Sequence, residues 1–173
     1  LKVTFRTSDT NVSPYFDIGS AGISLIKNVI NAPPTGGEVA ETEATDSHAL
    51  AKYITRKVTL AEGLEATSLK VFVDQNMPSG ASVEVYYRVI NSEDETNFEE
   101  RPYVLMTRRQ PSITVNQSVS LFNEYEYFAD DISYTSGSVT YDNFTTFSIK
   151  IVMYSTSSAA VPTFRNFRAI ALA

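Results

Sequence analysis

The sequence contains no cysteine and no tryptophan, and its single histidine is His48. Without cysteine there is no disulfide framework and no thiolate metal site, so stability must come from packing, hydrogen bonding or partner subunits. No apolar run approaches the roughly 20 residues that cross a bilayer, and the N-terminus lacks the charged-then-apolar order of a signal peptide. We therefore expect a protein that does not insert into a membrane.

The charge balance excludes another class of partner. The chain has 14 basic and 20 acidic residues, which gives a net charge of −6. A negative field repels polyphosphate and anionic lipid, so we expect no nucleic-acid partner. The length of 173 residues is within the usual size of one domain, and we expect residues 1–173 to form a single domain.

Apolar residues alternate with polar ones in short runs, as expected of half-buried strands. The clearest run has its apolar face at Val83, Val85, Tyr87 and Val89, with Glu84, Tyr86 and Arg88 opposite. Further strands are expected at 1–6, 23–30, 52–60, 69–73, 103–107, 124–128, 147–153 and 167–172. About nine strands separated by turn signals, without a ten-residue helical stripe, predict an all-β fold: an antiparallel, jelly-roll-like β-sandwich.

One segment breaks this pattern. Residues Asn31 to Ser47 read NAPPTGGEVAETEATDS, with a proline pair, a glycine pair and several acids but no periodicity. This composition is typical of an exposed loop or arm. The residues before it supply too few strands to bury a stable face alone, so we interpret the segment as an excursion from the single domain.

Three stretches together resemble a domain of known proteins. They are AKYITRKVTLAEGLEATSLKVFVDQNMPSGASVEVYYRVI at 51–90, YVLMT at 103–107 and FTTFSIKIVMYSTSSAAVPTFRNFRAIALA at 144–173. They are similar to a domain of tail and baseplate structural proteins of T4-like myoviruses, particularly phages of marine cyanobacteria. The segment SDTNVSPYFDI at 8–18 resembles what precedes that domain. The resemblance implies a β-sandwich module of a virion appendage, in a homotrimer or bound to neighbouring tail proteins.

Residues of types that act in catalysis are present, but they do not form a recognisable catalytic motif. His48 lies in a polar segment, and nothing around it supplies the oriented base and oxyanion hole of a triad. Carboxylates that could form a glycosidase pair are Glu84, Glu124, Glu126, Asp130 and Asp131. Surface charge explains each of them equally well, and we expect no enzyme. The acidic stretches 91–95 and 129–131 lack EF-hand spacing, so we expect neither a metal nor another cofactor.

Two pairs of residues are candidates for contacts with a partner. Tyr125 and Tyr127 share one face of a strand, and that face either packs internally or offers a platform for a sugar ring. Arg165 and Arg168 flank aromatic residues in PTFRNFR at 162–168. They either dock a partner or act as edge charges that discourage uncontrolled strand pairing.

The resemblance and the lack of a recognisable catalytic motif favour a non-catalytic virion structural protein. We expect it in a phage tail or baseplate, assembled in the host cytoplasm, with other virion proteins and sister subunits as partners and a trimer as the favoured oligomer. The alternative is a carbohydrate-binding or receptor-binding module of a tail fibre that contacts a host surface glycan.

Overall fold

The computed structural model describes residues 30–33, 41–44 and 49–173. The strand expected at 1–6, the strand expected at 23–30 except its last residue, and His48 lie outside these residues. In the described part the chain forms one 3-10 helix, η2 (Phe98–Glu100), and eleven strands. The strands are β1 (Lys52–Ile54), β2 (Val58–Thr59), β3 (Ser68–Asn76), β4 (Ala81–Ile90), β5 (Val104–Leu105), β6 (Thr107–Arg108), β7 (Asn123–Ala129), β8 (Tyr134–Ser136), β9 (Val139–Tyr141), β10 (Thr146–Ser155) and β11 (Thr163–Leu172).

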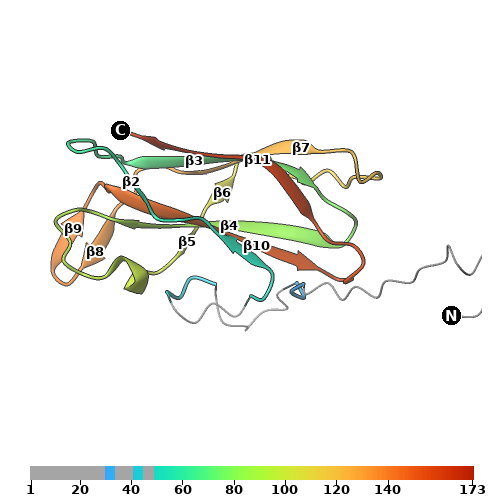
Figure 1. Cartoon of the computed structure of the whole chain (residues 1–173), viewed down its shortest axis with the longest axis horizontal. Helices are drawn as coiled ribbons and strands as arrows, with labels where there is room; N and C mark the ends of the chain where they lie inside the picture. The colour runs from blue at the N-terminus through green and yellow to red at the C-terminus, as the bar shows by residue number, and fades with distance from the viewer. Residues whose placement is uncertain (1–29, 34–40, 45–48) are drawn as a thin grey trace, which may run out of the picture.

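Two antiparallel sheets form the body of the domain (Figure 1). One sheet has the order β1-β10-β4-β5, with β2 also paired to β10, and we call it the β4 sheet. The other has the order β11-β3-β7-β6, and we call it the β3 sheet. Strands β8 and β9 form a separate hairpin at one end. The expected all-β, antiparallel sandwich is confirmed.

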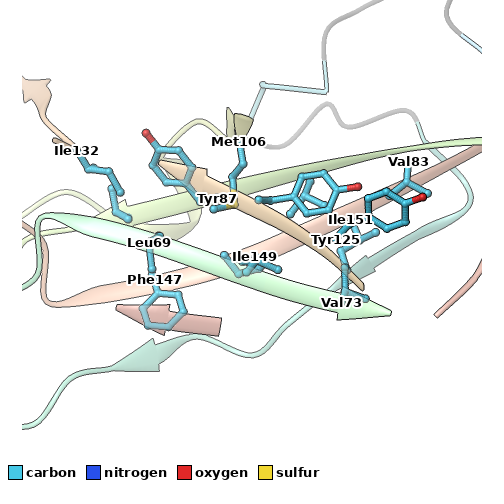
Figure 2. Close-up of a cluster of buried hydrophobic side chains, with 14 of the residues drawn as sticks. Leu69, Val73, Val83, Tyr87, Met106, Tyr125, Ile132, Phe147, Ile149 and Ile151 are labelled. Atoms are coloured by element: carbon cyan, nitrogen blue, oxygen red, sulfur yellow. The ribbon is translucent and has the colours of Figure 1, made fainter. Parts of the chain in front are cut away.

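The main core lies between the inner faces of the two sheets (Figure 2). The β4 sheet contributes Val83, Val85, Tyr87 and Val89 from β4 and Phe147, Ile149 and Ile151 from β10. The β3 sheet contributes Leu69, Val71 and Val73 from β3 and Tyr125 and Tyr127 from β7. These residues recur every second position because successive side chains of a strand point to opposite faces. The predicted core face of β4 is therefore confirmed.

The outer face of the β4 sheet is also buried, contrary to the half-buried strand predicted at 83–89. Tyr86 and Arg88 are only 5% and 3% exposed. Residues 41–44, Ala49 and residues 98–103 cover them. A hydrogen bond from the Tyr103 amide to the Thr42 carbonyl joins two of these segments. Glu41 is buried, so the expected exposed arm at 31–47 is wrong for this residue. Because this covering layer comes from segments that are distant in the sequence, the alternation of apolar and polar residues within β4 does not predict it.

Two predicted strands are interrupted. The strand expected at 52–60 is divided into β1 and β2, which both pair with β10. The strand expected at 103–107 is divided at buried Met106: β5 pairs with β4, and β6 pairs with β7 in the other sheet. Here the chain passes from one sheet to the other within a single residue. The hairpin of β8 and β9, with Gly137 at a φ of 60°, was not predicted.

Candidate functional site

An apolar pocket lies on the side of the sandwich where the outermost strands β1 and β11 face each other. We call this side the β1–β11 seam. The pocket has a volume of about 280 Å³ and is lined by Tyr53, Val73, Ile151, Phe164, Arg165, Asn166 and Phe167. Tyr53 and Phe167 meet edge to face across the seam, with 6.3 Å between ring centroids. The seam therefore combines an apolar interior with an opening to solvent.

A β-bulge in β11 shapes this pocket. The pairing of β11 with β3 shifts register between Arg165 and Arg168, and Asn166 has a φ of 54°. Asparagine tolerates this left-handed conformation better than most residues. Asp74 on β3 holds the bulge, since its Oδ2 accepts hydrogen bonds from Arg165 Nε at 3.2 Å and from Asn166 Nδ2 at 2.8 Å. The bulge allows both Phe164 and Phe167 to pack at the margin of the core.

Arg165 and Arg168 lie on β11 with their side chains about half exposed, at 53% and 57%. Each is ion-paired and also stacked on a ring. Arg165 bonds Asp74 and lies 4.1 Å from the centroid of Phe122. Arg168 Nη2 is 2.5 Å from Glu124 Oε2, and its guanidinium is 5.2 Å from the centroid of Phe72. The two arginines are thus fixed in place on an accessible surface.

Strand β11 is the long edge of the described sandwich. The strands at the other edges, β1, β2, β5 and β6, have two or three residues each, whereas β11 has ten. Among the described residues β11 pairs only with β3. Its outward positions Ile170 and Leu172 are 43% and 38% exposed. Short edge strands are a common protection against strand addition, and β11 lacks that protection.

Tyr125 and Tyr127, the second predicted contact pair, are not available to a partner. Both are 2% exposed and point into the core (Figure 2 labels Tyr125). The Tyr127 hydroxyl accepts a hydrogen bond from Gln75 Nε2 at 2.9 Å, and the Tyr125 hydroxyl accepts one from the Thr114 amide at 2.8 Å. The two tyrosines do share a face, as predicted, but it is the inner face of the β3 sheet. The hypothesis of a sugar platform at this pair is therefore wrong.

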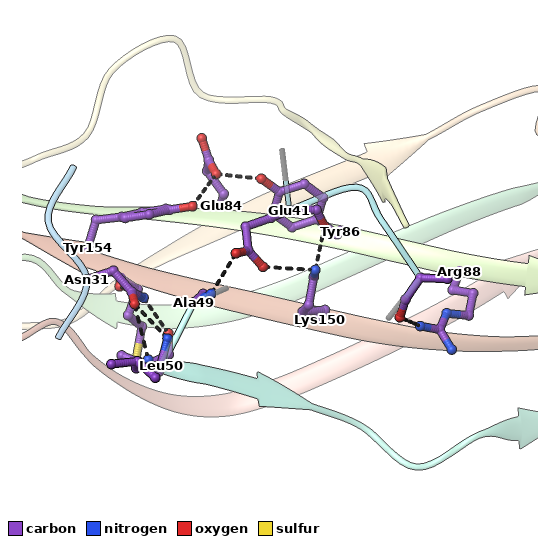
Figure 3. A network of polar contacts seen from close by, with 12 residues as sticks. Asn31, Glu41, Ala49, Leu50, Glu84, Tyr86, Arg88, Lys150 and Tyr154 are labelled. Carbon is purple, nitrogen blue, oxygen red and sulfur yellow. Dashed lines mark hydrogen bonds and ion pairs between the residues drawn. The ribbon is translucent and has the colours of Figure 1, made fainter. Parts of the chain in front are cut away.

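A second polar cluster lies under the layer that covers the β4 sheet (Figure 3). The side chain of Lys150 is fully buried, and its Nζ is 3.2 Å from Glu41 Oε2. The same Nζ lies 4.2 Å from the centroid of Tyr103 and 5.0 Å from that of Tyr86. Glu41 Oε1 accepts a hydrogen bond from the Ala49 amide at 2.7 Å. The cluster holds Glu41 and Ala49 against β10.

The covering layer changes the titration of its polar groups. Burial lowers the pKa of Lys150, although Glu41 acts in the opposite direction. Burial raises the pKa of Tyr86 and that of Tyr154 well above their ordinary values, and the nearby Glu84 carboxylate adds to both shifts. Glu84 Oε2 accepts hydrogen bonds from the hydroxyls of Tyr86 at 2.6 Å and Tyr154 at 3.0 Å. Each of these polar groups therefore has a partner within the covered face, and the cluster is part of the packing of this layer.

The carboxylates considered for acid-base chemistry are distributed over both outer faces. Glu84 lies on the outer face of the β4 sheet, whereas Glu124 and Glu126 are on the outer face of the β3 sheet, with the core between them. Glu126 pairs with Arg109 at 2.8 Å, and Glu124 pairs with Arg168. Asp130 and Asp131 are exposed at a turn, where Asp131 has a φ of 50°. Glu84 and either β7 glutamate therefore do not face a common cleft.

The acidic stretch after β4 is organised by internal hydrogen bonds. Asp94 Oδ1 accepts from the Thr96 amide at 3.0 Å and from the Ser136 hydroxyl at 3.1 Å. Burial alone would raise the pKa of Asp94, but hydrogen bonds from Thr96, Tyr134 and Ser136 outweigh it and lower that pKa. In the ranges that the structure describes, no three His, Cys, Asp or Glu side chains gather in a group that could hold a metal ion. The same ranges contain no helix long and apolar enough to span a membrane.

Sequence reasoning identified the two arginines but missed the rest of the seam. Tyr53 was expected only as part of a strand, and Phe164 and Phe167 only as neighbours of the arginines. Their convergence depends on which edge strands of the two sheets face each other, and a single sequence does not record that. The repeated aromatic-Arg pair in Phe164-Arg165 and Phe167-Arg168 was the one available signal.

Comparisons with known proteins leave the family of this chain open. No protein-family model matches the sequence, and no curated protein matches it significantly. Among solved structures, the chain is similar to a chain in the structure of infectious bursal disease virus Gt strain. The match has a TM-score of 0.33 and 11% sequence identity, and it covers 88% of this chain and 39% of that chain. A similarity this weak supports no inference about function.

Proposed function

We propose that this protein is a non-catalytic structural module of a virion that acts through protein-protein assembly. The observation that carries the proposal is the β1–β11 seam, where a ten-residue edge strand adjoins an apolar pocket. Exposed apolar side chains flank it on both sheets: Tyr53, Ile54 and Val58 on one, Ile170 and Leu172 on the other. An apolar area bordered by polar groups is characteristic of surfaces that bind other proteins.

The tail or baseplate is the proposed location within the virion. Support comes from the sequence resemblance at 51–90, 103–107 and 144–173. Those segments contain β3, β4, β10 and β11, which are the four longest described strands. The proposed partners are sister subunits, with a trimer favoured, and neighbouring virion proteins.

A carbohydrate-binding module is the second candidate, and it would use the same seam. Tyr53, Phe164 and Phe167 are three aromatic residues around one pocket, with Asn166 and Arg165 as polar neighbours. Sugar rings stack on exposed aromatic faces. The Tyr53 and Phe167 rings, however, lie at 72° to each other, so they do not form one flat platform. This geometry favours the assembly function.

Light scattering over a range of protein concentrations, combined with glycan-array binding on the same sample, separates the two candidates. A stable trimer or other oligomer of the 19.1 kDa chain without glycan binding is the result expected for an assembly module. A monomer that binds a defined sugar would overturn the proposal. In that case loss of sugar binding in Tyr53→Ala would assign the site to the seam.

A further inference from the structure

We propose that the β1–β11 seam binds an extended peptide strand of a neighbouring protein, which adds to the edge of β11 that faces away from β3. This inference rests on the proposed function and names the chemistry of the partner: apolar side chains at every second position, with acidic side chains between them. Three features of the seam support it, namely the backbone edge, the pocket and the charges.

The first feature is the backbone edge that β11 offers. A strand at the edge of a sheet presents a row of N–H and C=O groups, and an added strand satisfies them. From Arg168 to Leu172 the strand is regular and pairs with β3 at every residue. Its opposite edge has no partner strand among the described residues. The ten-residue length of β11 matches an ordinary strand, whereas the other edges, with two or three residues each, are too short to guide one.

The second feature is the pocket, which would receive one face of the added strand. Side chains of a strand alternate between the two faces of its sheet. On the inner face, the added strand would direct its side chains between the two sheets, toward Tyr53, Phe164 and Phe167. The pocket there has about 280 Å³ and is mostly apolar. This is at the lower end of the size range of ligand pockets, about 300 to 1,000 Å³. It suits an apolar side chain of a peptide.

The third feature is the charge beside the other face of the added strand. On the outer face, the added strand would lie beside Arg165 and Arg168, which remain half exposed despite their ion pairs. A guanidinium group has five N–H donors, so each arginine can bond a second carboxylate. Strand β11 has two basic residues and no acidic residue, in a chain of net charge −6. Charge complementarity therefore selects acidic side chains at the outward positions of the partner.

Under this proposal, Arg165 and Arg168 dock a partner and do not act as edge charges that discourage strand pairing. Free charges at an edge discourage strand pairing because pairing would desolvate them. Here Asp74 and Glu124 hold the two guanidinium groups on the outer face of the β3 sheet, where about half of each arginine side chain stays exposed. The arginines select which strand is added.

The test uses the full chain and a synthetic probe. A fluorescein-labelled nine-residue peptide that alternates leucine with glutamate is titrated with the protein, and binding is followed by fluorescence anisotropy. Comparison peptides alternate leucine with lysine, or carry N-methyl groups on alternate amides of the leucine-glutamate sequence. We expect saturable binding of the first peptide, with at least about tenfold weaker binding of both others. Absent binding, or equal binding of the lysine peptide or the N-methylated peptide, would overturn the inference.

A matched pair of variants locates the binding edge. Arg168→Glu changes the proposed site, and Arg109→Glu is its control. Arg109 lies just after β6 at the opposite edge of the same sheet, is 51% exposed, pairs with Glu126 at 2.8 Å and lies 4.8 Å from the centroid of Phe128. We expect Arg168→Glu to weaken peptide binding at least about tenfold and Arg109→Glu to leave it unchanged. Equal effects of the two variants would overturn the assignment to β11.

The outcome is separable from that of the proposed function. An oligomer in light scattering that does not bind the leucine-glutamate peptide would leave the assembly function standing and overturn strand addition at β11. A monomer that binds a sugar and not the peptide would overturn both.

Discussion

The two outer faces of the sandwich use the same interaction in opposite surroundings. On the β4 sheet, Lys150 meets Glu41 and two tyrosine rings with its side chain fully buried. On the β3 sheet, Arg168 meets Glu124 and the Phe72 ring with both charged side chains more than half exposed. In each case a cation is paired with a carboxylate and lies near an aromatic ring. Burial decides whether the arrangement is a fixed part of the fold or a surface open to a partner.

The largest expected effect comes from breaking the buried pair. In Lys150→Met the cation that faces Glu41 is lost, while the carboxylate stays under the covering layer. Removing one partner of a buried ion pair typically costs about 3 to 5 kcal/mol. We expect a loss of unfolding free energy in this range, measured by urea denaturation.

The double variant Lys150→Met/Glu41→Gln is the control for that measurement. The Glu41→Gln change removes the buried carboxylate charge and keeps an amide oxygen for the Ala49 N–H, so we expect the double variant to recover part of the lost stability. A loss below about 1 kcal/mol in the single variant would contradict a fully buried pair, because that is the range of exposed ion pairs.

The tyrosines of the covered face predict a loss of stability at alkaline pH. Their folded-state pKa values lie above the ordinary value of about 10, so the unfolded chain releases these protons first. The stabilising contribution is complete below pH 10 and is lost as pH rises beyond it. The lowered pKa of Lys150 has the opposite sign, since it increases stability with pH in the window just below about 10.5.

Comparing the wild type with Tyr86→Phe/Tyr154→Phe isolates the tyrosine contribution. We expect the denaturation midpoint of the wild type to fall more steeply between about pH 10 and 11 than that of the double variant. Parallel pH profiles of the two proteins would show that these hydroxyls do not control the alkaline transition.

The smallest effect is expected for the exposed pair. A double-mutant cycle of Arg168→Ala and Glu124→Ala should give a coupling free energy of about 0.2 to 1 kcal/mol, because solvent screens both charges. Added salt should reduce it further. A coupling as large as that of Lys150 and Glu41 would mean that the two faces do not differ in the way their exposure indicates.

Much of the fold follows from the local pattern of the sequence. Alternation at Leu69, Val71 and Val73, and again at Val83, Val85 and Tyr87, identifies the inner faces of β3 and β4. The pattern does not reveal that Tyr86 and Arg88 are also covered, because residues 41–44 and 98–103 are distant in sequence. Lys150 is missed for the same reason, since a lysine between apolar residues of a strand is normally on a solvent face.

The candidate site is predicted less completely than the fold. Arg165 and Arg168 were identified from their aromatic neighbours, and they do lie at an exposed edge. Tyr125 and Tyr127 were equally plausible as contact residues from the alternation, but this face of β7 points into the core. Which face of an amphipathic strand becomes the core depends on the sheet opposite it, and tyrosine is compatible with either side because it has an apolar ring and a polar hydroxyl.

At Met106 the main chain links the two sheets along one margin of the sandwich. The chain passes from the β4 sheet to the β3 sheet through this residue, so the margin of β5 and β6 is covalently continuous. At the opposite margin, Tyr53 and Phe167 meet through their rings. The pocket therefore lies at the margin where the two edge strands of the described sandwich, β1 and β11, meet through side chains.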